Sequence, residues 1–337
     1  MKKIKIAQIG INQYSHSLEI FDSLCRQSEL FEVAGIVFPE GEKERISAKY
    51  EKVKDYPELS LEEVLDDPQI EAVAIETDEI YLSQYAILAA KAGKHIHMEK
   101  PGGTELLEFE ELVQAVKQSG KVFHTGYMYR YNPYVADLLE RIKKGELGKI
   151  LCVDAQMSCI HPRQLRQWLQ ELPGGMMFYL GCHLVDLILQ IQGQPERILP
   201  MSRSSGQNTD ADDFGMAIFE YSTGVSVAKT SAQEIGGYAR RQLVVTGTEG
   251  TVELKPLEMF VPGKGIYTEK TEYWTKTWDH LGEHFKTPLF NRYDGMMAAF
   301  ASYVRGEREN PYTPDYELEL YKTVLKACGV NEGTGTR

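Results

Sequence analysis

The chain of 337 residues lacks any long uninterrupted apolar segment. Its start, "MKKIKIAQIG", reaches a glycine after an apolar run of about six residues, which is too short for the core of a signal peptide. No stretch approaches the ~18 apolar residues that a membrane-spanning helix needs. We therefore expect a cytoplasmic protein with no membrane partner.

Positive charge is the minority charge. The chain has 37 Lys and Arg against 49 Asp and Glu, and its formal net charge is −12. Because a nucleic-acid surface needs a concentrated positive field, we expect no nucleic-acid partner. A small anionic ligand stays possible, since the N-terminus of a helix can attract it locally.

Cysteine is scarce and follows no metal-binding pattern. The five cysteines form no paired C-x-x-C motif, and their odd number and scattered positions indicate free thiols in a reducing compartment. His95 and His97 alternate on one expected strand, but no third ligand has a suitable spacing. We expect no metal site. The cysteines are Cys25, Cys152, Cys159, Cys182 and Cys328.

Two different patterns divide the chain. Up to about residue 125, apolar runs such as "KIKIAQIG" and "IEAVAIET" alternate with helical segments such as "SHSLEIFDSLCRQ", which predicts a doubly wound parallel sheet. Beyond it, alternating segments such as "DFGMAIFEYS" and "VSVAKTSAQE" predict a large open, mostly antiparallel sheet. The expected fold class is α/β, with one domain over residues 1–124 and another over 125–337.

Five segments carry a family resemblance. They are "GKHIHMEKP" (93–101), "GYMYRYNP" (126–133), "GELGKI" (145–150), "GGMMFYLGCHLVD" (174–186) and "VTGTEGTVEL" (245–254). In this order they resemble motifs of the glucose–fructose oxidoreductase, inositol dehydrogenase and rhizopine catabolism (Gfo/Idh/MocA) family. The resemblance implies a Rossmann domain that binds NAD or NADP and a C-terminal domain for substrate and oligomer contacts. Because an open sheet must cover its apolar face, a homodimer or homotetramer is expected.

The resemblance also implies the chemistry. Hydride transfer from a hydroxyl-bearing carbon requires a base for the hydroxyl proton and a positive group near the oxygen. His183 suits the first role, and Lys100, before a Lys100–Pro101 bond that the resemblance implies is cis, suits the second. The expected substrate contacts are Tyr127, Met128, His161, Arg163 and Asp186. For His161 and Arg163 a solvated loop is the alternative, for Asp186 a helix surface, and Arg130 is a candidate ion-pair residue.

The expected cofactor site departs from the family pattern at its first turn. Where the family has G-x-G-x-x-G, this chain has Gly10, Asn12 and Ser15. Asparagine tolerates left-handed dihedral angles, so the turn can form, but the side chain crowds the pyrophosphate. Phe38 stands where the family binds the adenosine ribose with an acidic residue. Glu40, two residues on, is a candidate substitute for that acidic residue, and Phe38 can lie against adenine. The expected cofactor residues are Gly10, Ile11, Asn12, Gln13, Phe38, Thr77, Asp78, Glu99, Lys100 and Pro101.

Acidic residues set the expected cofactor preference. Glutamates within residues 40–44 would repel a 2′-phosphate, which favours NAD over NADP. Thr77, Asp78 and Glu79 replace the family's Thr-Pro-Asn, and Glu76 precedes them. Three carboxylates beside a pyrophosphate are electrostatically unfavourable, although solvent can screen them.

Tyr179 replaces the aspartate that the family places four residues before the histidine. On a regular helix it lies one turn from His183, on the same face. An aspartate would stabilise a protonated imidazole, whereas a tyrosine adds no charge. Two interpretations stay open: Tyr179 belongs to a proton relay as a third catalytic residue, or it only packs.

These patterns favour an NAD(P)-dependent oxidoreductase that acts on a sugar, polyol or related hydroxy compound. A competing hypothesis is a family member whose cofactor site has decayed, which binds a ligand or partner without a cofactor. A third keeps the cofactor but oxidises and re-reduces its substrate within one turnover. Because a pure binder has no need of a lysine–histidine pair, Lys100 and His183 favour catalysis.

Overall fold

The computed structural model describes residues 2–207 and 209–330. Within this range the chain divides into two compact units. The first comprises residues up to 127 together with 293–321, and the second comprises 128–292 together with the residues from 322 on. The return of 293–321 to the first unit was not part of the division expected from the sequence.

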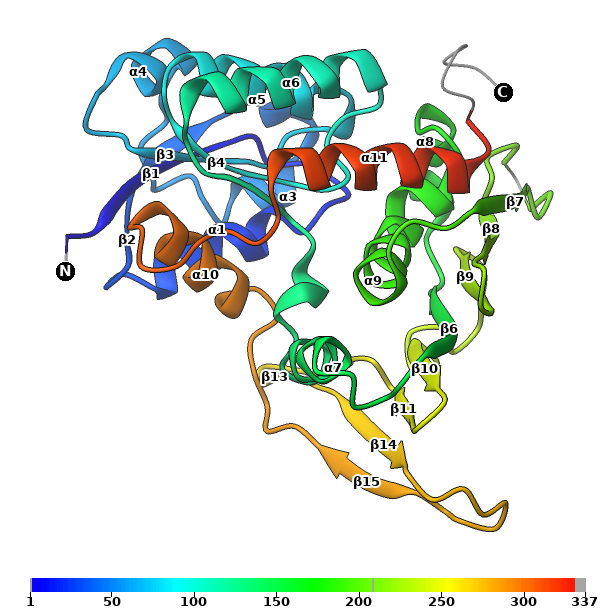
Figure 1. The fold of residues 1–337 in the computed structure, drawn as a ribbon. Coiled ribbons are helices and arrows are strands. Elements are labelled where there is room, and N and C mark those ends of the chain that lie inside the picture. Colours follow the sequence, from blue (N-terminus) through cyan, green and yellow to red (C-terminus); the bar gives the residue numbers. More distant parts are fainter. Residues whose placement is uncertain (1, 208, 331–337) are drawn as a thin grey trace. The chain divides into compact units, whose positions relative to one another are not determined.

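The first unit contains a five-stranded sheet in which every pair of neighbours is parallel (Figure 1). The strand order is β2-β1-β3-β4-β5, and the chain moves outward in both directions from β1 and β3. This confirms the expected doubly wound sheet. The strands are β1 (Ile4–Ile9), β2 (Phe31–Val37), β3 (Ala72–Ile75), β4 (His95–Met98) and β5 (Phe123–Thr125).

Helices cover both faces of this sheet. α5 and α6 lie over one face, and α1 and α10 lie over the other (Figure 1). The helices are α1 (Ser17–Arg26), α2 (Glu42–Arg45), α3 (Ser47–Tyr50), α4 (Leu61–Asp66), the 3-10 turn η1 (Glu79–Tyr81), α5 (Leu82–Lys91), α6 (Leu106–Ser119) and α10 (Asp294–Val304). Ser60 and Glu63 form a capping box at the start of α4.

Residues 42–50 form two short helices, α2 and α3. The break between them falls at Ile46, which is buried in an apolar cluster with Ile11 and Ile36. Glu42, the first residue of α2, has a fully buried side chain.

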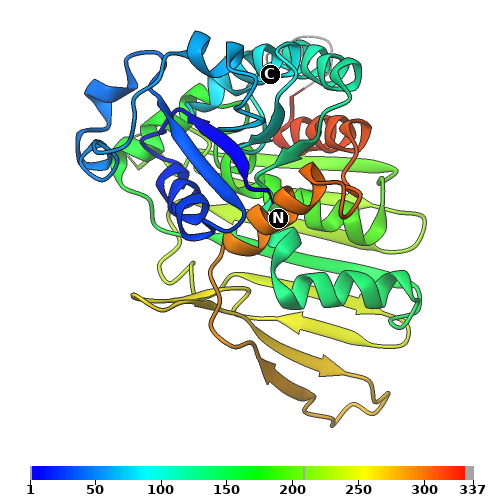
Figure 2. The same cartoon turned by 90° about the vertical axis from the view of Figure 1, so that its left-hand side faces the viewer.

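The second unit is built on an eight-stranded sheet of order β15-β14-β11-β10-β6-β9-β8-β7 (Figure 2). All neighbours are antiparallel except the β6–β9 pair, which confirms the expected mostly antiparallel sheet. Its strands are β6 (Ile150–Ser158), β7 (Arg197–Arg203), β8 (Phe214–Glu220), β9 (Val225–Ser231), β10 (Gln242–Gly247), β11 (Thr251–Leu254), β14 (Glu269–Tyr273) and β15 (Glu283–Lys286). A small ribbon pairs β12 (Met259–Val261) with β13 (Gly265–Tyr267).

In the first unit, β5 ends at Thr125, and the Tyr127 amide donates to the Thr125 carbonyl just after it (2.9 Å). In the second unit, a π-helical turn over 177–181 precedes α9. The helical elements are η2 (Met128–Tyr131), α7 (Pro133–Lys143), α8 (Arg163–Trp168), η3 (Leu169–Glu171), the π turn η4 (Met177–Gly181), α9 (Cys182–Gln192) and α11 (Pro314–Cys328), which begins in the first unit.

Three chemical features complete the description. All five cysteines are free thiols, as expected. In the described part of the chain, no helix has the length and apolar character needed to cross a membrane. Among the same residues, no group of three or more His, Cys, Asp and Glu side chains is arranged to hold a metal ion.

Candidate functional site

The candidate cofactor site lies at the carboxyl edge of the parallel sheet, where open α/β sheets bind ligands. Gly10 follows β1, Glu76 follows β3 and Glu99 follows β4. Backbone hydrogen bonds join these strand ends, since the Asn12 amide donates to the Glu76 carbonyl (3.0 Å) and the Glu99 amide donates to Ile75 (3.0 Å). Residues far apart in sequence therefore meet in one place.

The turn after β1 requires glycine at its first position. Gly10 has a φ of +89°, and a Cβ there would lie 2.5 Å from the Cα of Thr77. Asn12 does not adopt the left-handed conformation expected for it. In the described chain the positive-φ residue other than glycine is Glu40.

Asn12 instead stabilises the turn from inside. Its side chain is fully buried and donates from Nδ2 to Glu79 Oε2 (2.7 Å). Its Oδ1 accepts hydrogen bonds from the amides of Tyr14 (2.6 Å) and Ser15 (3.2 Å). These two amides point toward an oxygen that the chain itself provides, so Asn12 replaces the second glycine as an internal cap of the turn.

Glu42 reaches the same turn from α2. Its Oε2 accepts a hydrogen bond from the Ile11 amide (2.8 Å), and its Oε1 accepts one from Thr77 Oγ1 (2.5 Å). Burial raises the pKa of Glu42 to about 7. Sequence analysis had grouped Glu42 with its acidic neighbours, and no local pattern distinguished it from them.

A dinucleotide phosphate fits the donors of this turn. The Ile11 N–H and the Thr77 O–H both donate to one two-oxygen anion, the Glu42 carboxylate, and a phosphate group offers the same kind of acceptor pair. The Glu42 carboxylate thus accepts from two donors of a kind that also suits an anionic phosphate. A phosphate that takes these donors requires Glu42 to leave them.

The remaining expected cofactor residues have varied surroundings. Phe38 is half-buried and lies edge-on to Tyr50, with ring centroids 5.6 Å apart. Asp78 forms an ion pair with Arg45 (2.8 Å), and Gln13 is exposed. Phe38 therefore packs against Tyr50 on one side, and its expected contact with adenine stays a prediction.

Lys100 lies in a buried acidic environment at the end of β4. It is 8% exposed, and its Nζ is 3.3 Å from Glu99 Oε1. Burial raises the pKa values of Glu76 and Glu79 to about 8, and the positive charge of Lys100 opposes this rise in both. The Lys100–Pro101 peptide bond is cis, as the resemblance implied. Lys100 is therefore not the solvated lysine of an ordinary strand end.

In the second unit, His183 belongs to a buried aromatic and ionic cluster. Its ring lies edge-on to Tyr129, with centroids 5.2 Å apart. The Tyr129 hydroxyl accepts a hydrogen bond from Arg241 (3.2 Å), and Arg241 and Arg292 both pair with the buried Glu258. Burial raises the pKa of Tyr129 well above its usual value. Sequence analysis missed this cluster, because its members lie on separate elements and form no motif.

Tyr179 contacts two rings of the second unit. It lies in the π turn, where its ring is edge-on to Trp168 (5.4 Å) and close to His161 (5.9 Å). His161 Nε2 is 3.1 Å from Cys159 Sγ. Because the π turn changes the helical phase, a spacing of four residues does not give Tyr179 and His183 the same aromatic surroundings.

The other expected substrate residues divide between the units. Tyr127 is buried in the first unit, and Met128 begins the second. Arg163 is exposed at the start of α8. Asp186 is 1% exposed and forms an ion pair with Arg130, with Arg130 Nη2 2.8 Å from Asp186 Oδ1.

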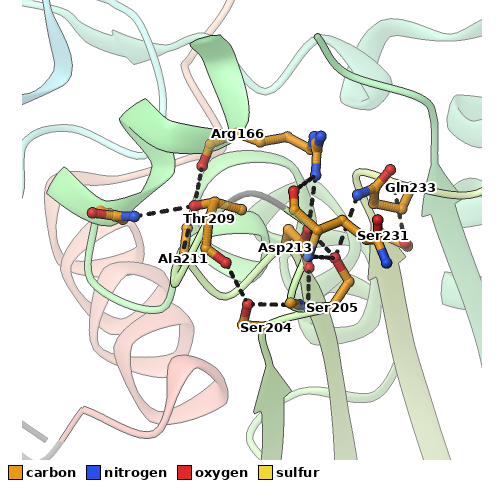
Figure 3. Close-up of polar contacts among 11 residues, drawn as sticks. Arg166, Ser204, Ser205, Thr209, Ala211, Asp213, Ser231 and Gln233 are labelled. Carbon is orange, nitrogen blue, oxygen red and sulfur yellow. Dashed lines mark hydrogen bonds and ion pairs between the residues drawn. The ribbon is translucent and has the colours of Figure 1, made fainter. Parts of the chain in front are cut away.

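The buried carboxylate of Asp213 organises the loop before β8 (Figure 3). Asp213 accepts hydrogen bonds from the amide and hydroxyl of Ser205 (2.7 and 2.6 Å), and Arg166 lies 3.5 Å away. Arg166 also donates to the carbonyl of residue 207 (2.7 Å). The network ties α8 to the segment between β7 and β8, which is a structural role.

Comparison with known proteins identifies both parts of the chain. Residues 4–127 match the profile of an oxidoreductase family with an NAD-binding Rossmann fold, GFO/IDH/MocA. Residues 135–253 match the profile of the GFO/IDH/MocA C-terminal domain. The two profiles follow one another in the order that the fold requires.

Individual relatives extend this similarity over most of the chain. A trans-1,2-dihydrobenzene-1,2-diol dehydrogenase of Bos taurus is 28% identical over 310 residues, which cover 84% of this chain and 85% of that protein. A 1,5-anhydro-D-fructose reductase of Ensifer adhaerens is 25% identical over 283 residues, covering 81% and 82%. A crystal structure of a putative NADPH-dependent oxidoreductase from Desulfitobacterium hafniense has the same fold, with a TM-score of 0.80, 18% identity, and coverage of 98% of this chain and 95% of that one.

Proposed function

The chain belongs to the GFO/IDH/MocA family of oxidoreductases, and we propose that it transfers a hydride between a nicotinamide cofactor and a sugar, polyol or related hydroxy compound. The observation that carries this proposal is Lys100, a buried cation held by Glu99 at the carboxyl end of β4. Burying a lysine costs desolvation free energy, which its ion pair with Glu99 only partly offsets. A cation at this place can stabilise negative charge that develops on a reacting oxygen.

Two side chains have separate roles in the proposed reaction, one stabilising charge and the other transferring a proton. When bound, the nicotinamide accepts or supplies the hydride. Lys100 donates a hydrogen bond to the reacting oxygen and stabilises its negative charge. His183 takes the hydroxyl proton in oxidation and returns it in reduction, as a general acid–base. Tyr179 either relays this proton or packs against Trp168, and its neutral side chain adds no charge to the site.

The cofactor residues in this proposal are those of the turn after β1 and of the two neighbouring strand ends. Gly10 and Asn12 shape the turn, while the Ile11 amide and Thr77 Oγ1 donate to a phosphate. We propose NAD in preference to NADP, because Glu40 and Glu44 are exposed beside this turn and would repel a 2′-phosphate.

The proposal keeps the substrate contacts that the sequence suggested. Tyr127, Met128, His161 and Arg163 keep the contact role that the sequence suggested. Asp186 acts through its ion pair with Arg130, which makes it a positioning residue.

We also propose a homodimer or homotetramer formed through the eight-stranded sheet. Ile218 pairs in register with Val227, and both are only half-buried on one face of the sheet. On the next strands, Asp154 pairs with Val227, and Val244 pairs with Asp154. Val244 is half-buried too. A second copy would remove these apolar side chains from water. Light scattering of the wild type and Ile218→Glu tests this, with a smaller particle expected for the variant.

A second candidate function is ligand binding without hydride transfer. The observation that favours it is Glu42, which already takes the donors that a phosphate would use. Binding and turnover separate the two candidates, since a cofactor-free binder neither binds a nicotinamide nucleotide nor reduces it.

The test is a turnover assay with NAD⁺ or NADP⁺ and a panel of polyols and sugars, followed by the absorbance of reduced nicotinamide. We expect reduction with at least one compound, and loss of it in Lys100→Ala. The control Lys286→Ala removes an exposed lysine of β15 and should retain full activity. A chain that binds neither nucleotide would overturn the proposal in favour of the second candidate.

A further inference from the structure

The Glu42 carboxylate occupies the turn after β1 in the manner of a bound phosphate. Its two oxygens accept from two different donors, the Ile11 amide at 2.8 Å and Thr77 Oγ1 at 2.5 Å. The side chain is fully buried. In open α/β folds, hydrogen-bond donors at this position commonly bind an anionic ligand. Here the Glu42 carboxylate accepts from them instead.

The segment that carries Glu42 is tied to the turn by its own charged side chains. Lys49 Nζ donates to the carbonyls of Asn12 (2.5 Å) and Ser15 (2.9 Å). Arg45 donates to the Asp78 carboxylate (2.8 Å) and to the Glu40 carbonyl (3.1 Å). The short helices α2 and α3 are thereby held beside the turn, with Glu42 directed inward.

We propose that Glu42 is a built-in competitor of the cofactor, which holds the phosphate donors of the turn until a dinucleotide displaces it. The inference rests on the proposed function, since it concerns the same cofactor site. Asn12 Oδ1 already accepts hydrogen bonds from the amides of Tyr14 and Ser15. Access of a phosphate to the turn therefore depends on whether Glu42 releases its two donors. The Ile11 amide and the Thr77 hydroxyl are the donors that change partner.

Displacement is feasible because Glu42 is held at a cost. A buried carboxylate loses its hydration, and only two hydrogen bonds replace it here. Burial raises its pKa to about 7, and Asp78 adds to this rise while Arg45 opposes it. Tyr85 is the further titratable group that faces Glu42, from α5. When Glu42 leaves the turn, its carboxylate regains hydration, and this offsets part of the free energy of the two lost hydrogen bonds.

The experiment measures binding of NAD⁺ to the purified chain by calorimetry, without any substrate. We expect Glu42→Ala to bind NAD⁺ about 10- to 100-fold more tightly than the wild type, the factor that one hydrogen bond to a charged group is worth. Glu42→Gln keeps one acceptor oxygen without the charge, so an intermediate affinity is expected. Glu51→Ala, which removes an exposed carboxylate from the same segment, is the matched control and should bind like the wild type.

Hydrogen exchange supplies a readout that needs no nucleotide. In the wild type the Ile11 amide is protected by Glu42, and in Glu42→Ala it should exchange faster while β1 stays protected. Unchanged protection would overturn the proposal. Glu42→Gln, which keeps the buried shape of the side chain, repeats the measurement if Glu42→Ala unfolds.

The binding outcomes separate this inference from the proposed function. Equal affinities of wild type and Glu42→Ala for NAD⁺, or weaker binding by the variant, overturn the competitor and leave the oxidoreductase standing. Absence of binding by both chains up to millimolar NAD⁺ and NADP⁺ overturns both. Tighter binding confined to the Glu42 variants supports both.

Discussion

Arg130 and Asp186 form a buried ion pair within the second unit, with Arg130 Nη2 2.8 Å from Asp186 Oδ1 and Nε 3.0 Å from Oδ2. Both side chains are almost fully removed from solvent. Gln190 Nε2 donates to the same carboxylate (2.9 Å). The pair joins η2 to α9, the helix that also carries His183, so it fixes the helix on which the proposed acid–base is mounted.

We expect Asp186→Ala to lower the free energy of unfolding by roughly 3–5 kcal/mol, because it leaves the Arg130 charge buried without its carboxylate. Chemical denaturation measures this. The double variant Arg130→Met, Asp186→Leu should recover much of the loss, and Glu220→Ala, at the exposed pair with Arg197, should cost less than ~1 kcal/mol. A stable Asp186→Ala protein with only a raised KM would instead indicate direct substrate contact.

Stability should fall as the pH rises, because Glu76 is buried. Its pKa is raised from 4.5 to about 8 in the folded chain, so between these values the folded chain keeps a proton that the unfolded chain has lost. Its contribution is complete below about 4.5 and is lost as the pH rises through about 8.

Glu76→Gln should therefore be more stable than the wild type above pH ~8, by on the order of a few kcal/mol, and similar to it near pH ~4. Unfolding curves across the pH range measure the difference. Glu79 has the same direction of shift, so a slope should remain in the variant. Glu62→Gln, at an exposed position of α4, should leave the curve unchanged, and an identical effect there would contradict the assignment to Glu76.

Cofactor affinity should depend on pH through Glu42. Its pKa is raised to about 7 while it is buried, so below this value the buried side chain keeps a proton that it gives up when NAD⁺ displaces it into water. Because displacement then releases a proton, we expect the wild type to bind NAD⁺ more tightly at pH ~8 than at pH ~6, and Glu42→Ala to lack this difference. A pH dependence that persists in Glu42→Ala would assign it to another group.

His183→Ala should reduce kcat by roughly 10²–10⁴-fold, the range typical for the loss of a general acid–base. The pH dependence of kcat should lose the limb that the histidine supplies. His284→Ala, at an exposed histidine of β15, is the control and should be silent. A rate within a factor of a few of the wild type would remove His183 from the mechanism and leave its ring as a packing partner of Tyr129.

The thiols should react in two classes. Cys182 and Cys328 are at most 1% exposed, so in the native protein they should resist a thiol reagent that labels all five cysteines after denaturation. Cys159 is partly accessible, but burial raises its pKa, so its reaction should be slow near neutral pH. Fewer than five thiols in the denatured, unreduced protein would show a disulfide.

Local sequence patterns predicted the features that depend on interactions between neighbouring residues. The Ser60–Glu63 capping box and the glycine that ends α5 are visible in a few neighbouring residues, and both are present. The parallel and antiparallel sheets followed from apolar periodicity, since burial on one or two faces leaves a different pattern. Motif spacing likewise brought Gly10, Lys100 and His183 to attention.

Residue type alone did not determine what each site residue contacts. Among the acidic residues of segment 40–44, Glu42 accepts a hydrogen bond from the Ile11 amide of the turn, whereas Glu40 and Glu44 are exposed. Tyr179 and His183 are four residues apart, yet Tyr179 belongs to a π turn and His183 to α9. The sequence by itself determined the family, the two sheets and the candidate residues. Only the tertiary structure decided which carboxylate holds the phosphate donors, because that depends on contacts between segments more than thirty residues apart, between Glu42 and both Ile11 and Thr77 (31 and 35 residues).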